Sequence, residues 1–116
     1  MARREAEALC VEGDAFLKQR KWDEGLAAFR AAAEKDPEMS AAWYSIAMAE
    51  CEKNGNQPCE AAYKPLKRCI ELNPNHARAQ CGLGIVLLYV RKDDARAEEH
   101  LQTAIRLAPN LSLIHI

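Results

Sequence analysis

Apolar and small residues recur three to four positions apart along most of the chain, which is the spacing of one face of an α-helix. Leu9, Gly13 and Phe16 mark the first such stretch, and Trp22 opens a second that runs to about Lys35. Four further stretches have the same spacing: about 40–54, 58–72, 77–91 and 94–107. Ala is abundant whereas Val, Ile and Thr are scarce, which favours helix over sheet. The pattern predicts an all-α chain of about six helices.

Prolines recur along the chain at nearly constant intervals. Pro37, Pro74 and Pro109 each follow the end of a predicted helix and are separated by 37 and then 35 residues. The same two intervals separate three further sets of residues: Phe29, Leu66 and Leu101; Ala32, Cys69 and Ala104; Gly25, Ala62 and Ala97. Self-similarity at this period is typical of stacked helix–turn–helix units, which bury their apolar faces against one another. Because the loops are short, successive helices should be antiparallel.

The chain resembles the tetratricopeptide repeat family, whose pattern places Trp, Leu, Gly and Tyr on a first helix (A) and Ala, Phe, Ala and Pro on a second helix (B). The matching residues are Leu9, Gly13, Phe16, Gly25, Phe29, Ala32 and Pro37 in unit one; Trp43, Ile46, Ala47, Ala62, Leu66, Cys69 and Pro74 in unit two; and Leu83, Gly84, Leu87, Ala97, Leu101, Ala104 and Pro109 in unit three. The resemblance implies three repeats within residues 1–109, at about 6–39, 40–76 and 77–109. It also implies a right-handed solenoid of antiparallel helix–turn–helix repeats.

Several features depart from the family pattern. Unit two is longer than the family's repeat, and the loop at Asn54–Pro58 accommodates the excess. Glu12, Glu50 and Gln80 replace apolar residues, so we expect them at the edge of the packing with their polar ends solvated. Pro65 lies inside the second B helix, where it should remove a hydrogen bond and kink the helix at a cost of about 3 kcal/mol. We expect a helix that starts near Pro58 and bends at Pro65.

Composition and charge narrow the classes of function. Lys and Arg number 16 against 17 Asp and Glu, whereas nucleic-acid or anionic-membrane surfaces need a clustered basic excess. Lys64, Lys67 and Arg68 form a short basic cluster, which we expect on an outer B helix as a solvated face. The longest apolar stretch, 82–90, is far shorter than the roughly 20 residues of a membrane span, and no apolar leader follows the first residues. We expect a cytoplasmic protein that binds neither nucleic acid nor membranes.

The cysteines and histidines are the candidates for chemistry. The cysteines are Cys10, Cys51, Cys59, Cys69 and Cys81. Their number is odd and no CxxC pair is present, so we interpret them as reduced packing residues and not as a zinc site or a disulfide framework. The candidate general bases are His76, His100 and His115. No catalytic motif surrounds any of these residues, so we expect no enzyme activity, no cofactor and no metal.

The resemblance also implies where a partner would bind. In the family, the A helices line a concave groove that holds an extended peptide or a partner helix. The corresponding residues here are Cys10, Val11, Asp14, Leu17, Tyr44, Ser45, Met48, Cys51, Arg78, Cys81, Ile85, Leu88 and Tyr89. Most of them are uncharged, so we expect a partner's apolar anchors to supply the affinity. The predicted function is a protein–protein interaction scaffold.

Two alternatives stay open beside this function. The chain can be a substrate-recruiting or regulatory segment of a larger enzyme. It can also be a co-chaperone domain, because one subclass of the family clamps the acidic C-terminal carboxylates of heat-shock chaperones with two Lys, two Asn and an Arg. Here Cys10, Asp14 and Ser45 occupy three of those positions. Gly82 replaces the Arg, and only Arg78 keeps a cation, which disfavours the clamp.

Residues 110–116 are predicted to be a short tail outside the repeats. The ending Leu-Ser-Leu-Ile-His-Ile resembles translated sequencing-adapter DNA, so the tail is either non-native or a genuine segment that folds back over the last helix. Solenoids usually finish with a helix whose outer face is polar, and this short, mostly apolar tail cannot form one. We therefore expect the chain to be incomplete at its C-terminus, where further repeats or self-association would cover the last unit.

Overall fold

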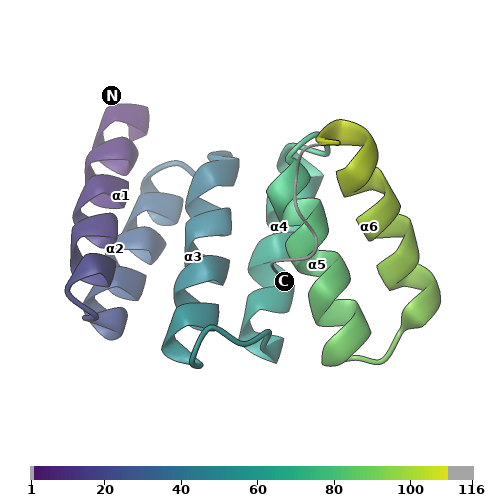
Figure 1. Ribbon diagram of the computed structural model, residues 1–116. Helices are drawn as coiled ribbons and strands as arrows, with labels where there is room; N and C mark the ends of the chain where they lie inside the picture. Colours follow the sequence, from purple (N-terminus) through teal and green to yellow (C-terminus); the bar gives the residue numbers. More distant parts are fainter. Residues whose placement is uncertain (1, 110–116) are drawn as a thin grey trace.

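In the computed structural model, which describes residues 2–109, the chain folds into six α-helices joined by short turns (Figure 1). The helices are α1 (Ala2–Lys18), α2 (Trp22–Lys35), α3 (Ser40–Lys53), α4 (Tyr63–Leu72), α5 (Ala77–Tyr89) and α6 (Asp94–Leu107), and a short 3-10 helix, η1 (Glu60–Ala62), precedes α4. No strand occurs within the described range. The prediction of an all-α helical repeat is confirmed. The predicted tail at 110–116 lies outside the described residues.

The helices form a row of antiparallel hairpins, α1–α2, α3–α4 and α5–α6, in which α2 packs against α3 and α4 against α5 (Figure 1). Glycine permits the close approach of helices in the outer two hairpins. A Cβ atom at Gly13 would lie 2.6 Å from the Phe29 ring, and one at Gly84 would lie 2.7 Å from Leu101. Any larger residue at either position would therefore push the paired helices apart.

The middle hairpin differs from the outer two in the residue at the helix contact, in its helix lengths and in its connection. Ala47 occupies the position that corresponds to Gly13 and Gly84, and its methyl group is fully buried. α4 has 10 residues against 14 in α2 and in α6, so less helix is available to pack against α3, and η1 packs against α3 as well. The turn between α3 and α4 also contains the long loop Asn54–Pro58. The middle hairpin thus has a longer connection and a shorter second helix than the other two.

Buried side chains form two clusters that meet at α3. The first contains Phe29 and joins α1, α2 and α3, whereas the second surrounds Leu66 and joins α3 to α6. Ile46 belongs to the first cluster and Ala47 to the second. Trp43 packs against both clusters. α3 is therefore the helix through which the two halves of the core are connected.

The turns between hairpins are built alike. Asp36 donates its backbone N–H to Ala32 over 3.0 Å, and Asn73 donates to Cys69 over 2.8 Å, which closes the preceding helix in each case. The side chains of Asp36 and Asn73 then accept the N–H groups two residues ahead, at 3.3 Å and 3.2 Å. Side chains of Asp and Asn stabilise turns in this way, which explains their place before the unit-ending prolines.

The turns within hairpins contain residues in the left-handed region. Arg20 has a φ of 61° in the first hairpin and Lys92 a φ of 58° in the third. In the longer loop of the second hairpin, Gly55 has a φ of 72° and Asn56 a φ of 61°. Such a residue is common just after a helix end, where it turns the chain back, but glycine is the type that adopts it without strain.

The prediction of a helix bent at Pro65 is wrong. After the loop the chain forms η1, and α4 begins only at Tyr63, so Pro65 falls in the first turn of α4. The N–H groups of a first turn have no acceptor within their own helix, so the missing N–H of proline costs little there. The late start of α4 thereby avoids the penalty of a proline in a helix interior.

Gln80 also departs from expectation, because it is buried with 5% of its surface exposed. Its side-chain N–H donates to the Pro74 carbonyl over 2.9 Å, and its Oε1 lies 2.7 Å from His100 Nδ1. Trp43, one unit earlier, donates its indole N–H to the Pro37 carbonyl over 2.9 Å. Gln80 therefore replaces Trp43 in an equivalent hydrogen bond, and its polar end is satisfied inside the protein.

The other two polar residues at apolar positions, Glu12 and Glu50, differ in exposure. Glu12 is exposed on α1. Glu50 is partly buried on α3 and accepts a hydrogen bond of 2.9 Å from Arg30 on α2. A second ion pair, Lys53 with Asp23 at 2.8 Å, joins the same two helices. The Lys53–Asp23 pair is largely exposed and contributes little to stability, whereas the Glu50 side chain of the first pair is only 17% exposed.

Candidate functional site

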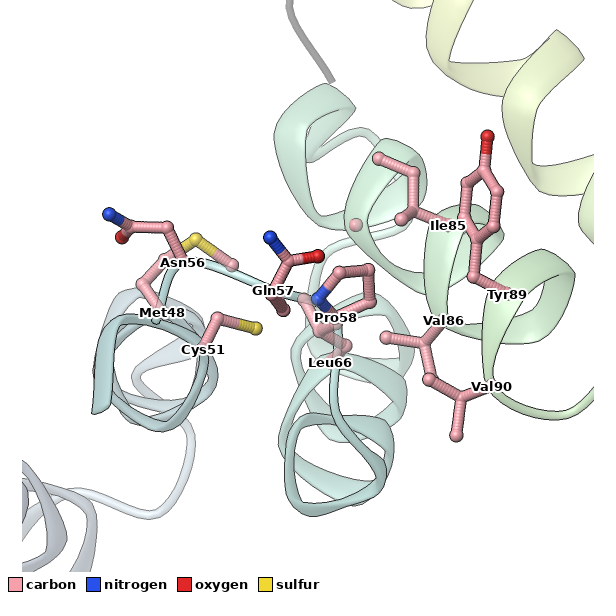
Figure 2. A pocket seen from close by; sticks show the side chains of 11 residues that line it. Met48, Cys51, Asn56, Gln57, Pro58, Leu66, Ile85, Val86, Tyr89 and Val90 are labelled. Carbon is pink, nitrogen blue, oxygen red and sulfur yellow. The ribbon is translucent and has the colours of Figure 1, made fainter. Parts of the chain in front are cut away.

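A pocket opens between the A helices α3 and α5 (Figure 2). It encloses about 690 Å³, within the range of about 300–1,000 Å³ that is typical of ligand sites. Its lining comes from α3, the loop after it, α4 and α5: Met48, Cys51, Asn56, Gln57, Pro58, Leu66, Gly82, Ile85, Val86, Tyr89 and Val90. In Figure 2, Gln57 and Pro58 lie between the side chains of α3 and those of α5.

Four of the predicted groove residues line this pocket, namely Met48 and Cys51 from α3 and Ile85 and Tyr89 from α5. Residues three or four positions apart lie on one face of a helix, so each pair points to the same side. Met48, Cys51 and Ile85 are half-buried, whereas Tyr89 is 57% exposed. The structure therefore brings together predicted residues from two different repeats.

The loop side of the pocket was not predicted. Asn56, Gln57 and Pro58 line the pocket from the loop, and the fully buried Leu66 lies beneath them on α4. The sequence showed the loop only as extra length in unit two. Because loop residues have no periodic pattern, that length was the only available signal for the loop's role.

No ionised side chain lines the pocket. Its polar members are the amides of Asn56 and Gln57 and the phenol of Tyr89. Burial raises the pKa of Cys51 to about 12, with a further contribution from the adjacent thiol of Cys59, so Cys51 is a neutral thiol at neutral pH. A neutral, mostly apolar lining favours apolar groups, because a charge placed there would lose its hydration without gaining a partner.

Tyr44 and Arg78 lie at the junction between the second and third hairpins, away from the pocket lining. The Tyr44 ring lies against His76, with 4.7 Å between the ring centroids and an interplanar angle of 35°. Burial raises the pKa of Tyr44, while the positive charge of Arg78 acts in the opposite direction. His76 Nδ1 accepts the Ala79 N–H over 3.1 Å and caps α5. Tyr44 is thus partly held by contacts inside the protein, whereas Arg78 is exposed.

The predicted groove residues of α1 do not reach the pocket: Cys10, Val11, Asp14 and Leu17. Val11 is 68% exposed and Asp14 is also exposed, so both belong to the open surface of α1. Leu17 instead packs inside the first hairpin, where its Cδ2 lies 2.9 Å from the place of a Cβ on Gly25. Burial raises the pKa of Cys10, and Asp14 and Glu7 act in the same direction.

Cys81 was predicted to line the groove, but it is 4% exposed and part of the buried core. Its helical spacing placed it with the other A-helix positions, but α5 packs against both α4 and α6, which leaves a narrower free face than expected. Leu88 is half-buried and packs against the second core cluster. Ser45 is half-buried and lies outside the pocket lining.

Between residues 2 and 109, no three His, Cys, Asp or Glu side chains are arranged to hold a metal ion. Within the same range, no helix has both the length and the apolar character required to cross a membrane. Burial raises the pKa of the thiol of Cys10 and likewise of Cys81, so both are protonated at neutral pH. His76 and His100 are engaged in contacts inside the fold. Among the features of residues 2–109 described above, the neutral pocket is therefore the one best suited to a ligand.

Comparison with known proteins identifies similar chains. The family model of the tetratricopeptide repeat matches this chain twice, over residues 10–63 and 59–112. Anaphase-promoting complex subunit 3 of Schizosaccharomyces pombe is 28% identical over 108 residues, which cover 93% of this chain and 16% of that protein. Protein bimA of Emericella nidulans is 29% identical over 108 residues, covering 93% of this chain and 13% of that protein. The chain thus spans less than a fifth of the length of these relatives.

A solved structure has a similar fold. The first TPR of Spaghetti (RPAP3), bound to the HSP90 peptide SRMEEVD, superposes with a TM-score of 0.82 at 20% sequence identity. The match covers 93% of this chain and 82% of that chain. At this level of identity the similarity shows a shared fold.

Proposed function

Because the chain belongs to the tetratricopeptide repeat family, we propose that it holds a partner protein, as an extended peptide or a helix, along the A helices α1, α3 and α5. The observation that carries the proposal is the uncharged pocket between α3 and α5. The remaining predicted groove residues that are accessible, such as Val11 on α1 and Arg78 near the start of α5, would extend this surface.

The chemistry of the surface indicates how affinity would arise. Met48 has a flexible, polarisable side chain that adapts to irregular shapes, and Tyr89 offers a large amphipathic ring. Both line the pocket, and Tyr89 is largely exposed before any partner binds. Burial of a partner's apolar anchors against these side chains would supply most of the binding free energy.

Panning a library of random linear peptides on the full chain would test the proposal. We expect the selected peptides to bind at least about tenfold more weakly to Met48→Asp, because the charge would be desolvated in the pocket. Ile105→Asp on α6 introduces the same charge at an exposed apolar residue outside the pocket and should leave binding unchanged. Selected peptides that bind both variants equally well would contradict the proposal.

A carboxylate clamp is the second candidate, because the similar RPAP3 domain is bound to an acidic peptide. Cys10, Asp14 and Gly82 stand at clamp positions here, and Arg78 is the cation that remains. We expect no saturable binding of SRMEEVD to the full chain by fluorescence anisotropy. Saturable binding that Arg78→Ala abolishes, while Met48→Asp leaves it intact, would replace the pocket proposal with the clamp.

The interaction surface can also serve a larger assembly. The two curated relatives are several times longer than this chain, so a recruiting or regulatory segment of a larger protein is compatible with the same surface. The test is to identify the proteins that co-purify with the intact parent protein and that no longer do so with Met48→Asp. Their identity would distinguish a separate scaffold from a recruiting or regulatory segment of a larger protein. A cytoplasmic location and the absence of enzyme activity stay predictions.

A further inference from the structure

We infer that the long loop Asn54–Pro58 closes one end of the binding surface, so that the pocket takes one large uncharged apolar side chain of the partner peptide together with the adjoining peptide backbone. This inference rests on the proposed function, since it names the chemical group that the same pocket accepts. It concerns a feature in which this chain departs from its family, namely the extra length of unit two.

The backbone of the loop explains how it comes to line the pocket. Gly55 and Asn56 both have positive φ, 72° and 61°, which reverses the chain directly after α3. The reversal is fixed at its start, because Gly55 donates its N–H to Glu52 over 3.1 Å. Cys59 is extended and leads into η1. Gln57 and Pro58 are thereby placed between α3 and α5, as Figure 2 shows.

The loop borders the pocket at one end of the A helices. Cys51 lies in the last turn of α3 and Tyr89 is the last residue of α5, so the loop borders the C-terminal ends of both A helices. A peptide lying along the A helices from their N-terminal ends therefore meets Gln57 and Pro58 at the far end. The loop acts as a wall against which a bulky side chain can be enclosed.

The lining determines the chemistry of the occupant. Most of the pocket is aliphatic or sulfur-containing, its lining contains no Asp, Glu, Lys, Arg or His, and the raised pKa of Cys51 keeps that thiol neutral at neutral pH. The nearby charges of Arg91 and Glu60 are paired with each other, and the Arg91 guanidinium also lies 3.6 Å from the centre of the Tyr63 ring. A charged side chain entering the pocket would find no free counter-charge there, so the occupant is neutral.

The amides of the loop complement the apolar part. Among residues 2–109 the side chains of Asn56 and Gln57 form no hydrogen bond with another residue, and both residues are exposed. Each amide offers two donor hydrogens and an acceptor oxygen, which is the complement of a peptide backbone. A volume of about 690 Å³ exceeds one side chain, which leaves room for backbone beside the anchor.

A host–guest series of capped peptides tests the inference. The probe is a nine-residue Gly/Ser peptide, acetylated and amidated, with Leu, Phe, Ser, Asp or Lys at its central position. Binding to the full chain is followed by ¹⁵N NMR titration of the Gly82 amide and of the Asn56 and Gln57 side-chain amides. We expect the Leu and Phe peptides to bind about tenfold more tightly than the Ser peptide, from burial of one apolar side chain, and the Asp and Lys peptides no better than Ser.

Two loop variants test the role of the wall. Deletion of residues 54–56 removes the extra length, and Pro58→Asp places a charge in the pocket without changing the length. Both variants should reduce the preference for the Leu peptide over the Ser peptide to less than about twofold. The deletion removes the loop that encloses the side chain, and the substitution removes the neutrality of the lining. Pro37→Asp makes the same substitution at an exposed turn between hairpins and should keep the preference. If the deletion variant fails to fold, Pro58→Asp alone decides the outcome.

The results separate this inference from the proposed function. Equal binding of the Leu and Asp peptides, or a full preference for Leu in Pro58→Asp, would overturn the inference. If peptides from the random library still bind and respond to Met48→Asp, the proposed function stands without it. If neither the host peptides nor library peptides bind, both proposals fail.

Discussion

Phe29 is fully enclosed, with none of its surface exposed and its ring directly over Gly13. We expect Phe29→Ala to lower the free energy of unfolding by about 3–5 kcal/mol, the range for truncation of a buried aromatic residue. Urea denaturation followed by circular dichroism measures the loss. Ala27→Gly on the exposed side of α2 is the control and should cost no more than about 1 kcal/mol. A loss below about 1 kcal/mol for Phe29→Ala would contradict the described core.

Lys92 adopts a left-handed backbone conformation that is unfavourable for a residue with a side chain. We expect Lys92→Gly to raise the free energy of unfolding by about 1 kcal/mol, because glycine adopts a positive φ without steric strain. Arg20→Gly should act in the same direction for the same reason. Thermal denaturation of the two variants tests this. Lys21→Gly, next to Arg20 but with a negative φ of −93°, should not stabilise the chain, and equal stabilisation there would refute the explanation.

His76 and His100 are partly buried, and burial lowers the pKa of each below its ordinary value of 6.5. The unfolded chain therefore binds more protons than the folded chain as the pH falls through 6.5. Stability from these groups is fully present above pH 6.5 and is lost as the pH falls further toward the lowered folded values. Urea denaturation at pH 8 and at pH 5.5 should show lower stability at pH 5.5. The double variant His76→Asn with His100→Gln should reduce the difference, and an unchanged difference would assign it to other groups.

The burial of Gln80 could not be predicted from the sequence. Its place in the repeat was evident, but a polar residue at an apolar position was assigned to the solvated edge. The partners that keep it buried, the Pro74 carbonyl and His100, come from a turn and from a different helix. Such a pairing depends on the packing of α5 against α6, which the local pattern does not contain. Cys81 was misplaced for a related reason, because the free width of a helix face depends on its neighbours.

At the scale of the helices, Pro65 gives a direct test of the structure. We expect Pro65→Ala to change the free energy of unfolding by less than about 1 kcal/mol, because the residue lies in the first turn of α4, where proline is tolerated. Lys67→Pro, only two residues later, should cost about 3 kcal/mol, because proline there would face the carbonyl four residues before it. Urea denaturation compares the two. A gain of several kcal/mol for Pro65→Ala would indicate a kinked helix instead.

Helix positions followed well from the sequence because each helix has its own apolar face and a polar or proline end. α2 runs over Trp22–Lys35 as expected, and α3 and α6 end within a residue of the predicted positions. The start of α4 did not follow, because a 3-10 turn and a proline both lie where the helix was expected to begin. The loop Asn54–Pro58 was recognised as an insertion, yet its contribution to the pocket depends on where α3 and α5 come together.

At the scale of the whole molecule, the repeat architecture was predictable because one short pattern recurs and each unit needs a neighbour. The division of the core into two clusters was not predictable in the same way. The two clusters meet across α3, where Ile46 belongs to one and Ala47 to the other, and that boundary depends on how the neighbouring helices pack. The methyl group of Ala47 is fully buried in the second cluster, so Ala47→Gly should lower the free energy of unfolding by about 1 kcal/mol, measured by urea denaturation. An unchanged free energy of unfolding would contradict this packing.

The junction between α4 and α5 has a mechanical consequence. α4 is the shortest of the six α-helices, and it shares less contact with α5 than any other two successive α-helices share, so the stiffness of the molecule is lowest there. A chain pulled at both ends should yield first between α4 and α5, while the hairpins on either side keep their shape. Bending at that place changes the distance between α3 and α5, and with it the width of the pocket. The curvature of this protein and the size of the ligand that its pocket accepts should therefore vary together. Tension on the chain should weaken the binding of a peptide that needs a narrow pocket.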